Sequence, residues 1–287
     1  MIEQIQLGKI GLNKKRTPSV AHRLLAVTVL ATFTASCGGS TDGSDMGIPP
    51  PVGAPAPTPP PSSTPPVAAW TCTARDAVRY VTNFRVMPLN GTVRIVVVGS
   101  SSTAGVGATS QQNGYVAVLQ RLLNARTDLA SFQLINKGVS GDSLAKIEAR
   151  LQRDVLDENP QLVVLQTGTN DAIIEPNVSG ASEFGGRLRS VVAKIRVQSP
   201  VIIINGQYYP ALPANYQLYM STIQQTAIEQ DVPLFDRFGL MKSQVDSGQY
   251  TFSSLLAPDN LHPNEFSHDC MGSTLSDLIV GTIQRVP

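Results

Sequence analysis

The chain has 287 residues, of which 42% are hydrophobic and 15% are charged. This length and composition suit one globular domain together with a segment that is not globular. The formal net charge is +1 at pH 7, which excludes a strongly basic protein of the nucleic-acid-binding kind.

The first 36 residues have the layout of a secretory signal. Five Lys or Arg residues precede the apolar run "LLAVTVLATF" at 24–33, which is too short to span a bilayer. The following "TASCGGS" resembles the lipobox of bacterial lipoproteins, with Thr34 where Leu is usual, so we expect Cys37 to become a lipid-carrying N-terminus. Gly38 and Gly39 resemble the pattern of outer-membrane lipoproteins. The alternative is an ordinary signal peptide with a chance cysteine.

Cleavage of the signal would change the charge of the protein. The signal holds five basic residues and one Glu, a charge of +4, so the mature chain carries +1 less +4, or −3. No basic patch remains that would favour nucleic acid as a partner. Together with the signal and the lipobox-like ending, this charge leads us to predict an exported monomer. We expect it to be anchored through its N-terminal lipid in the outer membrane of a Gram-negative bacterium, on the periplasmic or cell-surface face.

Residues 37–69 are predicted to be the lipid-anchor cysteine and a disordered tether. No apolar periodicity occurs between Gly38 and Ala69, and ten prolines fall between Pro49 and Pro66. Such a stretch cannot bury enough apolar surface to offset its ordering entropy, and proline biases it to extended polyproline II. At ~3.1 Å per residue, this 18-residue proline-rich core would hold the following domain about 55 Å from the membrane. The globular domain is then 70–287.

The chain has three cysteines. If Cys37 carries lipid, Cys72 and Cys270 remain as one candidate disulfide pair in an oxidising compartment. The alternative is two buried thiols.

The globular domain alternates predicted strands with predicted helices. Strands are indicated by continuous apolar, β-branched runs at 93–98, 132–136, 162–166 and 201–205, with a weaker fifth run at 232–236. Helical patterns occupy 114–126, 143–156, 183–197, 213–230 and 264–285. This alternation predicts an α/β fold, in which helices cover both faces of a parallel sheet and ligands bind at the carboxyl ends of the strands.

Polar clusters lie where such a sheet would bind a ligand. They are "GSSSTAG" (99–105), "KGVSGDS" (137–143), "TGTND" (167–171) and "DNLHP" (259–263). The mature chain has only two histidines, and it lacks His-x-x-x-His, Cys-x-x-Cys and phosphate-loop motifs, so we expect neither a metal site nor a cofactor. Nucleophilic catalysis remains, with a serine, a histidine base and an acid that orients the base.

The candidate base and acid are three residues apart. One turn brings the Asp259 carboxylate to one ring nitrogen of His262 and leaves the other nitrogen for the site. The rival base, His268, lies in the last helical pattern and near Cys270, which favours a packing role. For the oxyanion, Asn170 offers a side-chain N–H, and a glycine in the second cluster offers a backbone N–H.

These four clusters, in this order, resemble the conserved blocks of the SGNH or GDSL hydrolase family over roughly residues 93–275. The resemblance implies a three-layer α/β/α flavodoxin-like fold, with a central, mostly parallel sheet of about five strands. It also implies an enzyme without a metal that acts on esters or thioesters.

The tetrapeptide "GDSL" itself stands at 141–144, which raises the question whether Ser143 is the nucleophile. An oxyanion glycine would then have to follow it before "TGTND", yet residues 144–167 contain no glycine. Ser101 satisfies the order instead, because Gly141 and Asn170 follow it in turn. Ser143 is then predicted to be the N-cap of the next helix.

One departure from the family pattern concerns Ser100. The family's Gly-Asp-Ser at the nucleophile is here Gly99-Ser100-Ser101, which puts the loop geometry in doubt but removes no triad residue. Ser100 and Ser102 are alternative nucleophiles, and the Gly-x-Ser-x-Thr register favours Ser101. The resemblance implies that Ser101 attacks, His262 is the base and Asp259 orients it, and that the backbone N–H groups of Ser101 and Gly141 and the Asn170 side chain bind the oxyanion.

The sequence therefore predicts an extracytoplasmic serine esterase that forms an acyl-enzyme. Its substrates are expected to be small-molecule or polysaccharide esters with O-acetyl or short acyl groups. The alternatives are a lysophospholipase or thioesterase and, from another class, a catalytically inactive surface-binding lipoprotein on the same fold. The segments 172–186 and 206–210 follow strands and are candidates for the pocket wall or for loop packing.

Overall fold

A computed structural model describes residues 78–79 and 91–283 of the chain. All of them lie in the second of the two units into which the chain divides, Thr64–Pro287. The predicted signal peptide (1–36), Cys37, the rest of the predicted tether and Cys72 lie outside the described residues.

The described strands form one sheet in the order β1-β6-β5-β4-β2-β3. The strands are β1 (Val78–Arg79), β2 (Thr92–Gly99), β3 (Ser131–Gly138), β4 (Leu162–Gln166), β5 (Val201–Ile204) and β6 (Leu234–Phe235). Every pair of neighbours is parallel except β1 and β6. The five parallel strands, β2 to β6, are the five predicted ones, and their order is that of a flavodoxin-like doubly wound sheet. Strand β1 was not predicted.

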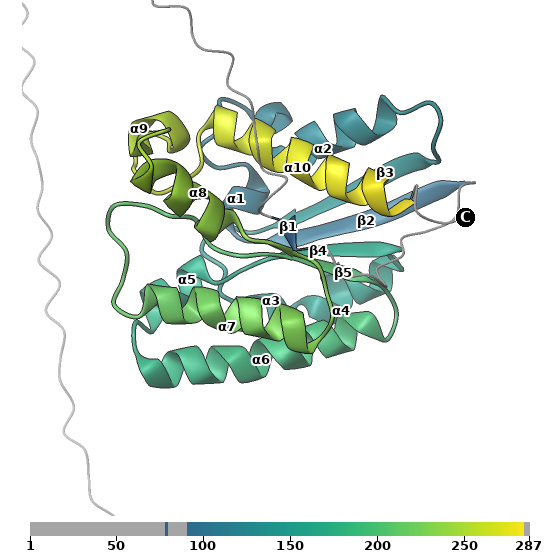
Figure 1. Cartoon of the computed structure of the whole chain (residues 1–287). Helices are drawn as coiled ribbons and strands as arrows, with labels where there is room; N and C mark the ends of the chain where they lie inside the picture. The colour runs from purple at the N-terminus through teal and green to yellow at the C-terminus, as the bar shows by residue number, and fades with distance from the viewer. Residues whose placement is uncertain (1–77, 80–90, 284–287) are drawn as a thin grey trace, which may run out of the picture. The chain divides into compact units, whose positions relative to one another are not determined.

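Helices cover both faces of this sheet, which gives three layers (Figure 1). The helices that form the two layers are α2 (Tyr115–Asn124) and α10 (Glu265–Ile283) on one face and α3 (Leu144–Ala149), α4 (Leu151–Asp154), α6 (Val178–Arg196) and α7 (Tyr216–Glu229) on the other. The shorter or peripheral helices are α1 (Ser101–Ala104), α5 (Thr169–Ile174), α8 (Arg237–Asp246) and α9 (Phe252–Leu255), with 3-10 turns η2 (Gln111–Asn113) and η3 (Leu156–Glu158). The predicted α/β/α fold is confirmed.

The continuous apolar strands pack into both layers, as their sequence predicts. In β2, Ile95 and Val97 belong to the core cluster that includes α2 and α10, whereas Val96 and Val98 belong to the cluster on the opposite face. All four side chains are fully buried. Removing a buried aliphatic side chain of this kind costs on the order of 2–5 kcal/mol, so these strands fix the frame on which the loops are held.

Two predicted helices differ from the observed ones. The pattern at 143–156 is not one helix, because the backbone leaves the helical conformation at Arg150 (φ −109°, ψ 5°), where α3 ends and α4 begins. The helix predicted from 183 starts earlier, at Val178, because the Asn177 side chain accepts a hydrogen bond from the Gly180 N–H (2.7 Å) and caps it. Helices α1, α5, α8 and α9 were not predicted.

The carboxyl ends of β2 and β3 approach the first short helix very closely. A Cβ at Gly138, the last residue of β3, would lie 2.8 Å from the Ala104 Cα in α1. Glycine therefore lets α1 pack directly against the end of β3. In the described part of the chain, no helix is long and apolar enough to cross a membrane.

Candidate active site

The candidate nucleophile lies at the carboxyl end of β2. Ser101 is the first residue of α1, a position where the backbone N–H has no partner within its own helix. Its Oγ lies 2.9 Å from the Nε2 of His262, although 161 residues separate the two in the chain. The structure thus brings together the serine and the histidine that the sequence analysis paired.

A tight turn holds the candidate acid against the histidine. The Oδ1 of Asp259 accepts hydrogen bonds from the backbone N–H groups of Leu261 and His262, both at 3.0 Å. Its Oδ2 lies 2.6 Å from the His262 Nδ1. With Nδ1–H donating to Asp259, the Nε2 of His262 accepts the hydroxyl proton of Ser101, which is the arrangement a general base requires.

The turn also decides the charge of the acid. Partial burial works to raise the pKa of Asp259, but the hydrogen bonds from the His262 ring and from the backbone N–H groups of His262 and Leu261 outweigh it and lower the pKa to about 2. Asp259 is therefore ionised at neutral pH. An ionised carboxylate beside Nδ1 favours the tautomer described above and stabilises the imidazolium that forms when Nε2 takes a proton.

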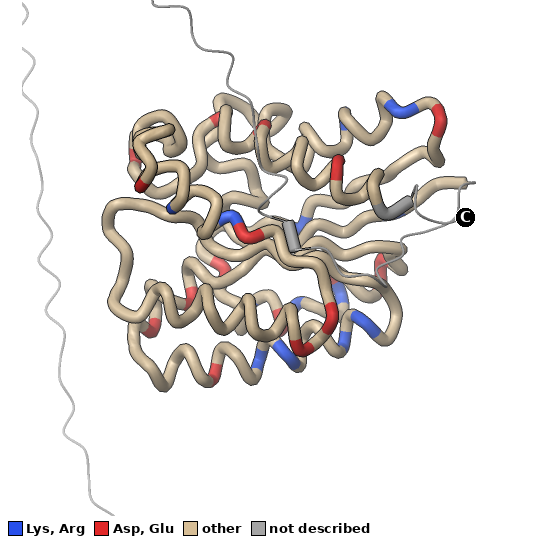
Figure 2. Tube along the Cα trace, viewed as in Figure 1, with Lys and Arg blue, Asp and Glu red and all other residues tan. Residues whose placement is uncertain are grey.

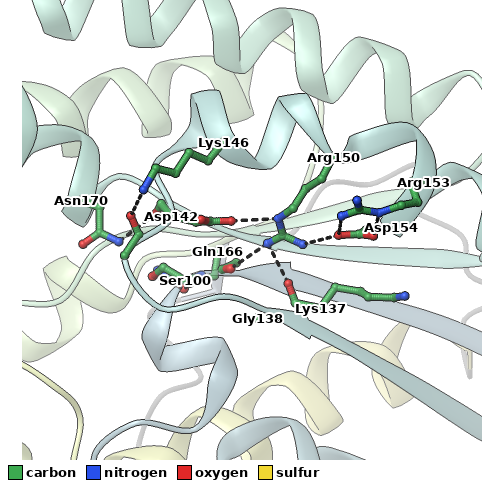
Figure 3. A network of polar contacts seen from close by, with 12 residues as sticks. Ser100, Lys137, Gly138, Asp142, Lys146, Arg150, Arg153, Asp154, Gln166 and Asn170 are labelled. Atoms are coloured by element: carbon green, nitrogen blue, oxygen red, sulfur yellow. Dashed lines mark hydrogen bonds and ion pairs between the residues drawn. The ribbon is translucent and has the colours of Figure 1, made fainter.

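Hydrogen bonds link the candidate oxyanion donors to each other and to the turn 99–101 that carries Ser101, here called the nucleophile turn (Figure 3). The Asn170 Nδ2 donates to the backbone carbonyl of Asp142 (2.8 Å), which immediately follows Gly141. The N–H of Val139 donates to the carbonyl of Gly99 (3.0 Å), two residues before Ser101. Because Nδ2 carries two hydrogens, the bond to Asp142 fixes the amide and leaves its second N–H as a donor.

Gly141 has a backbone conformation that favours glycine. Its φ is +79°, and a Cβ built there meets no atom within 4 Å. A side chain at this position would therefore not obstruct the backbone donor by contact with a neighbouring atom. Glycine is favoured because the left-handed conformation itself disfavours a residue with a Cβ.

Ser100, which replaces the family's aspartate, is buried against a strand-end glutamine. The Oε1 of Gln166 accepts from the Ser100 N–H (3.0 Å), the Ser100 hydroxyl (3.1 Å) and the Thr103 hydroxyl (3.1 Å). These bonds tie the nucleophile turn to the end of β4, so serine keeps this turn bound to the sheet. Ser100 and Ser102 are both buried, which leaves Ser101 as the serine of this turn that faces His262.

Ser143 occupies the predicted N-cap position of α3, but its side chain makes no capping hydrogen bond. The N–H of Leu144 instead donates to the Oδ1 of Asp171 (2.8 Å), and burial raises the pKa of that carboxyl. The prediction that Ser143 caps the helix is therefore right in position and wrong in mechanism.

The rival base, His268, is fully buried in α10 and has the predicted packing role. Its Nδ1 accepts from the Tyr115 N–H (3.2 Å), and its Nε2 is 3.0 Å from the carbonyl of Val106, to which it donates. Burial lowers the pKa of this ring and keeps it neutral. Both nitrogens are thus engaged by backbone groups.

The two segments considered as pocket walls differ in what they contact. In 206–210, the ring of Tyr209 is buried edge-on against Tyr216, and Tyr208 packs edge-on against Phe238. Most of 172–186 belongs to α5 and α6, where Ile174, Glu183 and Phe184 line a pocket of about 90 Å³ beside Ser143.

Sequence reasoning missed several buried polar residues around the site. Gln207 donates to the carbonyl of Leu261 (2.9 Å) and accepts from Arg237 (2.7 Å), so it supports the turn that carries His262. Gln166 and Gln207 lie at or just after the ends of apolar strands, and a polar residue there is a signal that could have found them. Arg150 gave no such signal, because it stands among the polar positions of a helical pattern.

Outside this site, the charged groups show mixed signs. Figure 2 shows Lys and Arg interspersed with Asp and Glu along the helices of the α6 and α7 face. Within residues 78–79 and 91–283, no three His, Cys, Asp or Glu side chains gather as a group able to hold a metal ion. Cys270 is disulfide-bonded, and since Cys72 lies outside the described residues, their pairing stays a prediction.

The chain matches one protein-family model and is similar in sequence to two esterases. Residues 76–285 match the model of the non-GDSL lipase-like family. The chain is 31% identical over 122 residues to the esterase TesA of Pseudomonas aeruginosa, a match that spans 42% of this chain and 56% of TesA. It is 24% identical over 168 residues to an acetylxylan esterase of Geobacillus stearothermophilus, spanning 54% of this chain and 75% of that enzyme.

A solved structure agrees with the sequence relatives. The lipase/acylhydrolase from Enterococcus faecalis superposes with a TM-score of 0.57 at 25% identity, covering 66% of this chain and 96% of that one. The family model covers well over half of the 287 residues. The chain belongs to the non-GDSL lipase-like family and has the fold of the SGNH hydrolases.

Proposed function

We propose that this protein is a serine esterase that hydrolyses carboxylic esters through an acyl-enzyme. The observation that carries the proposal is the hydrogen-bonded chain from the Ser101 Oγ to the His262 Nε2 (2.9 Å) and from the His262 Nδ1 to the Asp259 Oδ2 (2.6 Å). A serine is a weak nucleophile at its own pKa and needs such an adjacent base. An inactive binding protein on the same fold has no need of this alignment.

The proposed reaction has two halves. In the first, His262 takes the Ser101 proton as Oγ attacks the acyl carbon, and it then gives that proton to the departing alcohol. In the second, His262 takes a proton from water, the resulting hydroxide attacks the acyl-enzyme, and Ser101 recovers the proton as the acid leaves. Asp259 stays ionised throughout and stabilises the imidazolium.

Each tetrahedral intermediate carries a negative oxygen that needs donors. We assign the Ser101 N–H, the Gly141 N–H and the second Nδ2 hydrogen of Asn170 to this oxygen. Removing one donor from an oxyanion hole typically lowers kcat by about 10²–10³-fold. The link from Asn170 to Asp142 supports this assignment, because it holds the amide beside the Gly141 turn.

For the substrate, we propose O-acetyl or short-chain acyl esters, on a polysaccharide or a small molecule. An open hollow of about 470 Å³ lies beside the turn that carries the base, and its lining includes Thr109, Asn260 and Glu265. Hydroxyl, amide and carboxylate groups of this kind can bind sugar hydroxyls. The acetylxylan esterase among the relatives supports the same substrate class. A series of p-nitrophenyl esters of increasing acyl length, set beside acetylated xylan and lysophospholipid, distinguishes an acetyl esterase from a lysophospholipase.

We also propose that Cys37 carries lipid and anchors the enzyme outside the cytoplasm, as a monomer without a nucleic-acid partner. The support is the signal and the lipobox-like "TASC" in the sequence. A precursor with Cys37→Ala should fail to incorporate labelled palmitate, whereas a chain that starts near Ala68 should stay folded and active in solution. Lipid incorporation by the Cys37→Ala precursor would overturn the assignment.

The central experiment compares the two serines with a fluorophosphonate probe and p-nitrophenyl acetate. Ser101→Ala should abolish labelling and lower kcat by several powers of ten. Ser143→Ala removes no hydrogen bond to the helix, so labelling and turnover should stay within about twofold of the wild type. Recovery of the probe on a peptide containing Ser143 rather than Ser101 would show that the literal "GDSL" serine is the nucleophile.

A further inference from the structure

Arg150 is a partly buried arginine whose guanidinium joins four segments behind the candidate oxyanion hole (Figure 3). Its side chain is only 10% exposed. It donates to the carboxylates of Asp142 (2.8 Å) and Asp154 (3.0 Å) and to the backbone carbonyls of Gly99 (3.2 Å) and Lys137 (2.8 Å). The side chain thus reaches the ends of β2 and β3, the loop that holds Gly141 and Asp142, and helix α4.

The segments that Arg150 holds are those that carry the proposed oxyanion donors. Gly99 lies two residues before Ser101, and Asp142 immediately follows Gly141. The carbonyl of Asp142 receives the Asn170 amide at 2.8 Å. A continuous path therefore runs from the guanidinium, through the Asp142 side chain and backbone, to the amide of Asn170.

The planar guanidinium can hold several loops at once because of its geometry. Its N–H groups point in fixed directions within one plane, so one side chain can orient several acceptors at once, whereas the lysine ammonium is a compact charge without a planar fork. Asp154 also accepts from Arg153, at 2.6 and 3.0 Å, and these two arginines lower its pKa to about 2, so a charged carboxylate holds the far side of Arg150. The break between α3 and α4 falls at Arg150 itself.

We propose that Arg150 is a positioning residue for the oxyanion hole, acting through Asp142 on Asn170. This inference rests on the proposed esterase function. A purely structural role would stabilise the same loops without favouring one orientation of the Asn170 amide. The two roles differ in whether the effect of Arg150 depends on Asn170.

A double-mutant cycle tests that dependence. Arg150→Lys keeps the charge and removes the fork, Asn170→Ala removes the donor, and the third variant combines them. Arg153→Lys is the matched control, because Arg153 binds the same Asp154 but its side chain is 77% exposed and makes no bond to Asp142. If Arg150→Lys does not fold, Asp142→Asn tests the same link, since it weakens the ion pair with Arg150 and keeps the backbone carbonyl that accepts from Asn170. Thermal unfolding of each variant verifies that it is folded.

With p-nitrophenyl acetate, we expect Arg150→Lys to lower kcat by about 10-fold, part of the 10²–10³-fold typical for a lost donor, and to change KM by less than twofold. Asp142→Asn should lower kcat about threefold, and Arg153→Lys should leave it unchanged. In the Asn170→Ala background, Arg150→Lys or Asp142→Asn should lower kcat by less than twofold further. An equal fall in both backgrounds, or no fall in either, would overturn the proposal.

The ¹H–¹⁵N signal of the Asn170 side-chain amide separates this inference from the proposed function. We expect it to shift in Arg150→Lys and Asp142→Asn and to stay unchanged in Arg153→Lys, whether or not the protein turns over an ester. Absence of turnover and probe labelling in the wild type would refute the esterase function. An unchanged amide signal in both Arg150→Lys and Asp142→Asn would refute the positioning role.

Discussion

Replacing Gly141 by alanine separates backbone strain from steric obstruction at the proposed oxyanion hole. The φ of Gly141 is +79°, and an added Cβ would meet no atom within 4 Å. The cost of the substitution therefore comes from the left-handed backbone conformation alone, which disfavours a residue with a Cβ by about 1–2 kcal/mol. The chain can bear this strain or relieve it by changing φ, and the second route turns the backbone N–H away from the oxyanion.

Two other glycines provide matched controls. Gly91 has a φ of +97° and also has no atom within 4 Å of its Cβ position, but it precedes β2, at the opposite end of the strand from Ser101. Gly186 is equally open, without a positive φ, inside helix α6. Alanine at Gly186 should stabilise the helix by about 0.5–1 kcal/mol. The three substitutions thus differ in strain and in place, while none of them creates a clash.

Thermal unfolding and turnover of p-nitrophenyl acetate give the measurement. For a domain of this size, 1 kcal/mol corresponds to about 2–4 °C in Tm, so we expect Tm to fall by about 2–8 °C in Gly141→Ala and Gly91→Ala. Gly186→Ala should raise it by about 1–4 °C. Only Gly141→Ala should also lower kcat, by about 10-fold or more. Full activity in Gly141→Ala, or a rise in its Tm like that of Gly186→Ala, would refute the reasoning.

Three further predictions concern the triad acid, the buried histidine and the cysteines. Asp259→Asn should lower kcat by about 10⁴-fold with little change in folding, because the amide cannot hold the required histidine tautomer, and steady-state kinetics check this. The pKa of buried His268 is lowered, so its contribution to stability is complete above the unfolded pKa of about 6.5 and is lost as pH falls toward the folded value. Urea unfolding at pH 8 and pH 5.5 should therefore show a larger loss of stability in the wild type than in His268→Gln, and equal losses would contradict it. Non-reducing peptide mapping of exported protein should find Cys72 joined to Cys270, a bridge worth up to about 5 kcal/mol, and two free thiols would refute the pairing.

Several features of the fold were predictable because their information is local in the chain. Continuous β-branched runs such as 162–166 are stable only when buried on both faces, so they identified the parallel strands without knowledge of their neighbours. The absence of glycine between 144 and 167 likewise decided in favour of Ser101 over Ser143. Helices as short as α1 and α9, with four residues each, span about one turn and show too little periodicity to be recognised.

The sequence by itself determined the five parallel strands, their alternation with the longer helices, and the order of the residues that meet at the site. Only the tertiary structure decided how those residues are held, because their partners are distant in the chain. Ser100 is bound by Gln166, 66 positions away, and the Ser101 hydroxyl meets a ring nitrogen 161 positions away. Arg150 donates to the carbonyl of Gly99, 51 positions away. It lies between α3 and α4, and the amphipathic pattern of the predicted helix 143–156 places it on the solvent-facing side. A local pattern records which face of an element is apolar, but the partner of a buried polar group depends on which segments the folded sheet brings together.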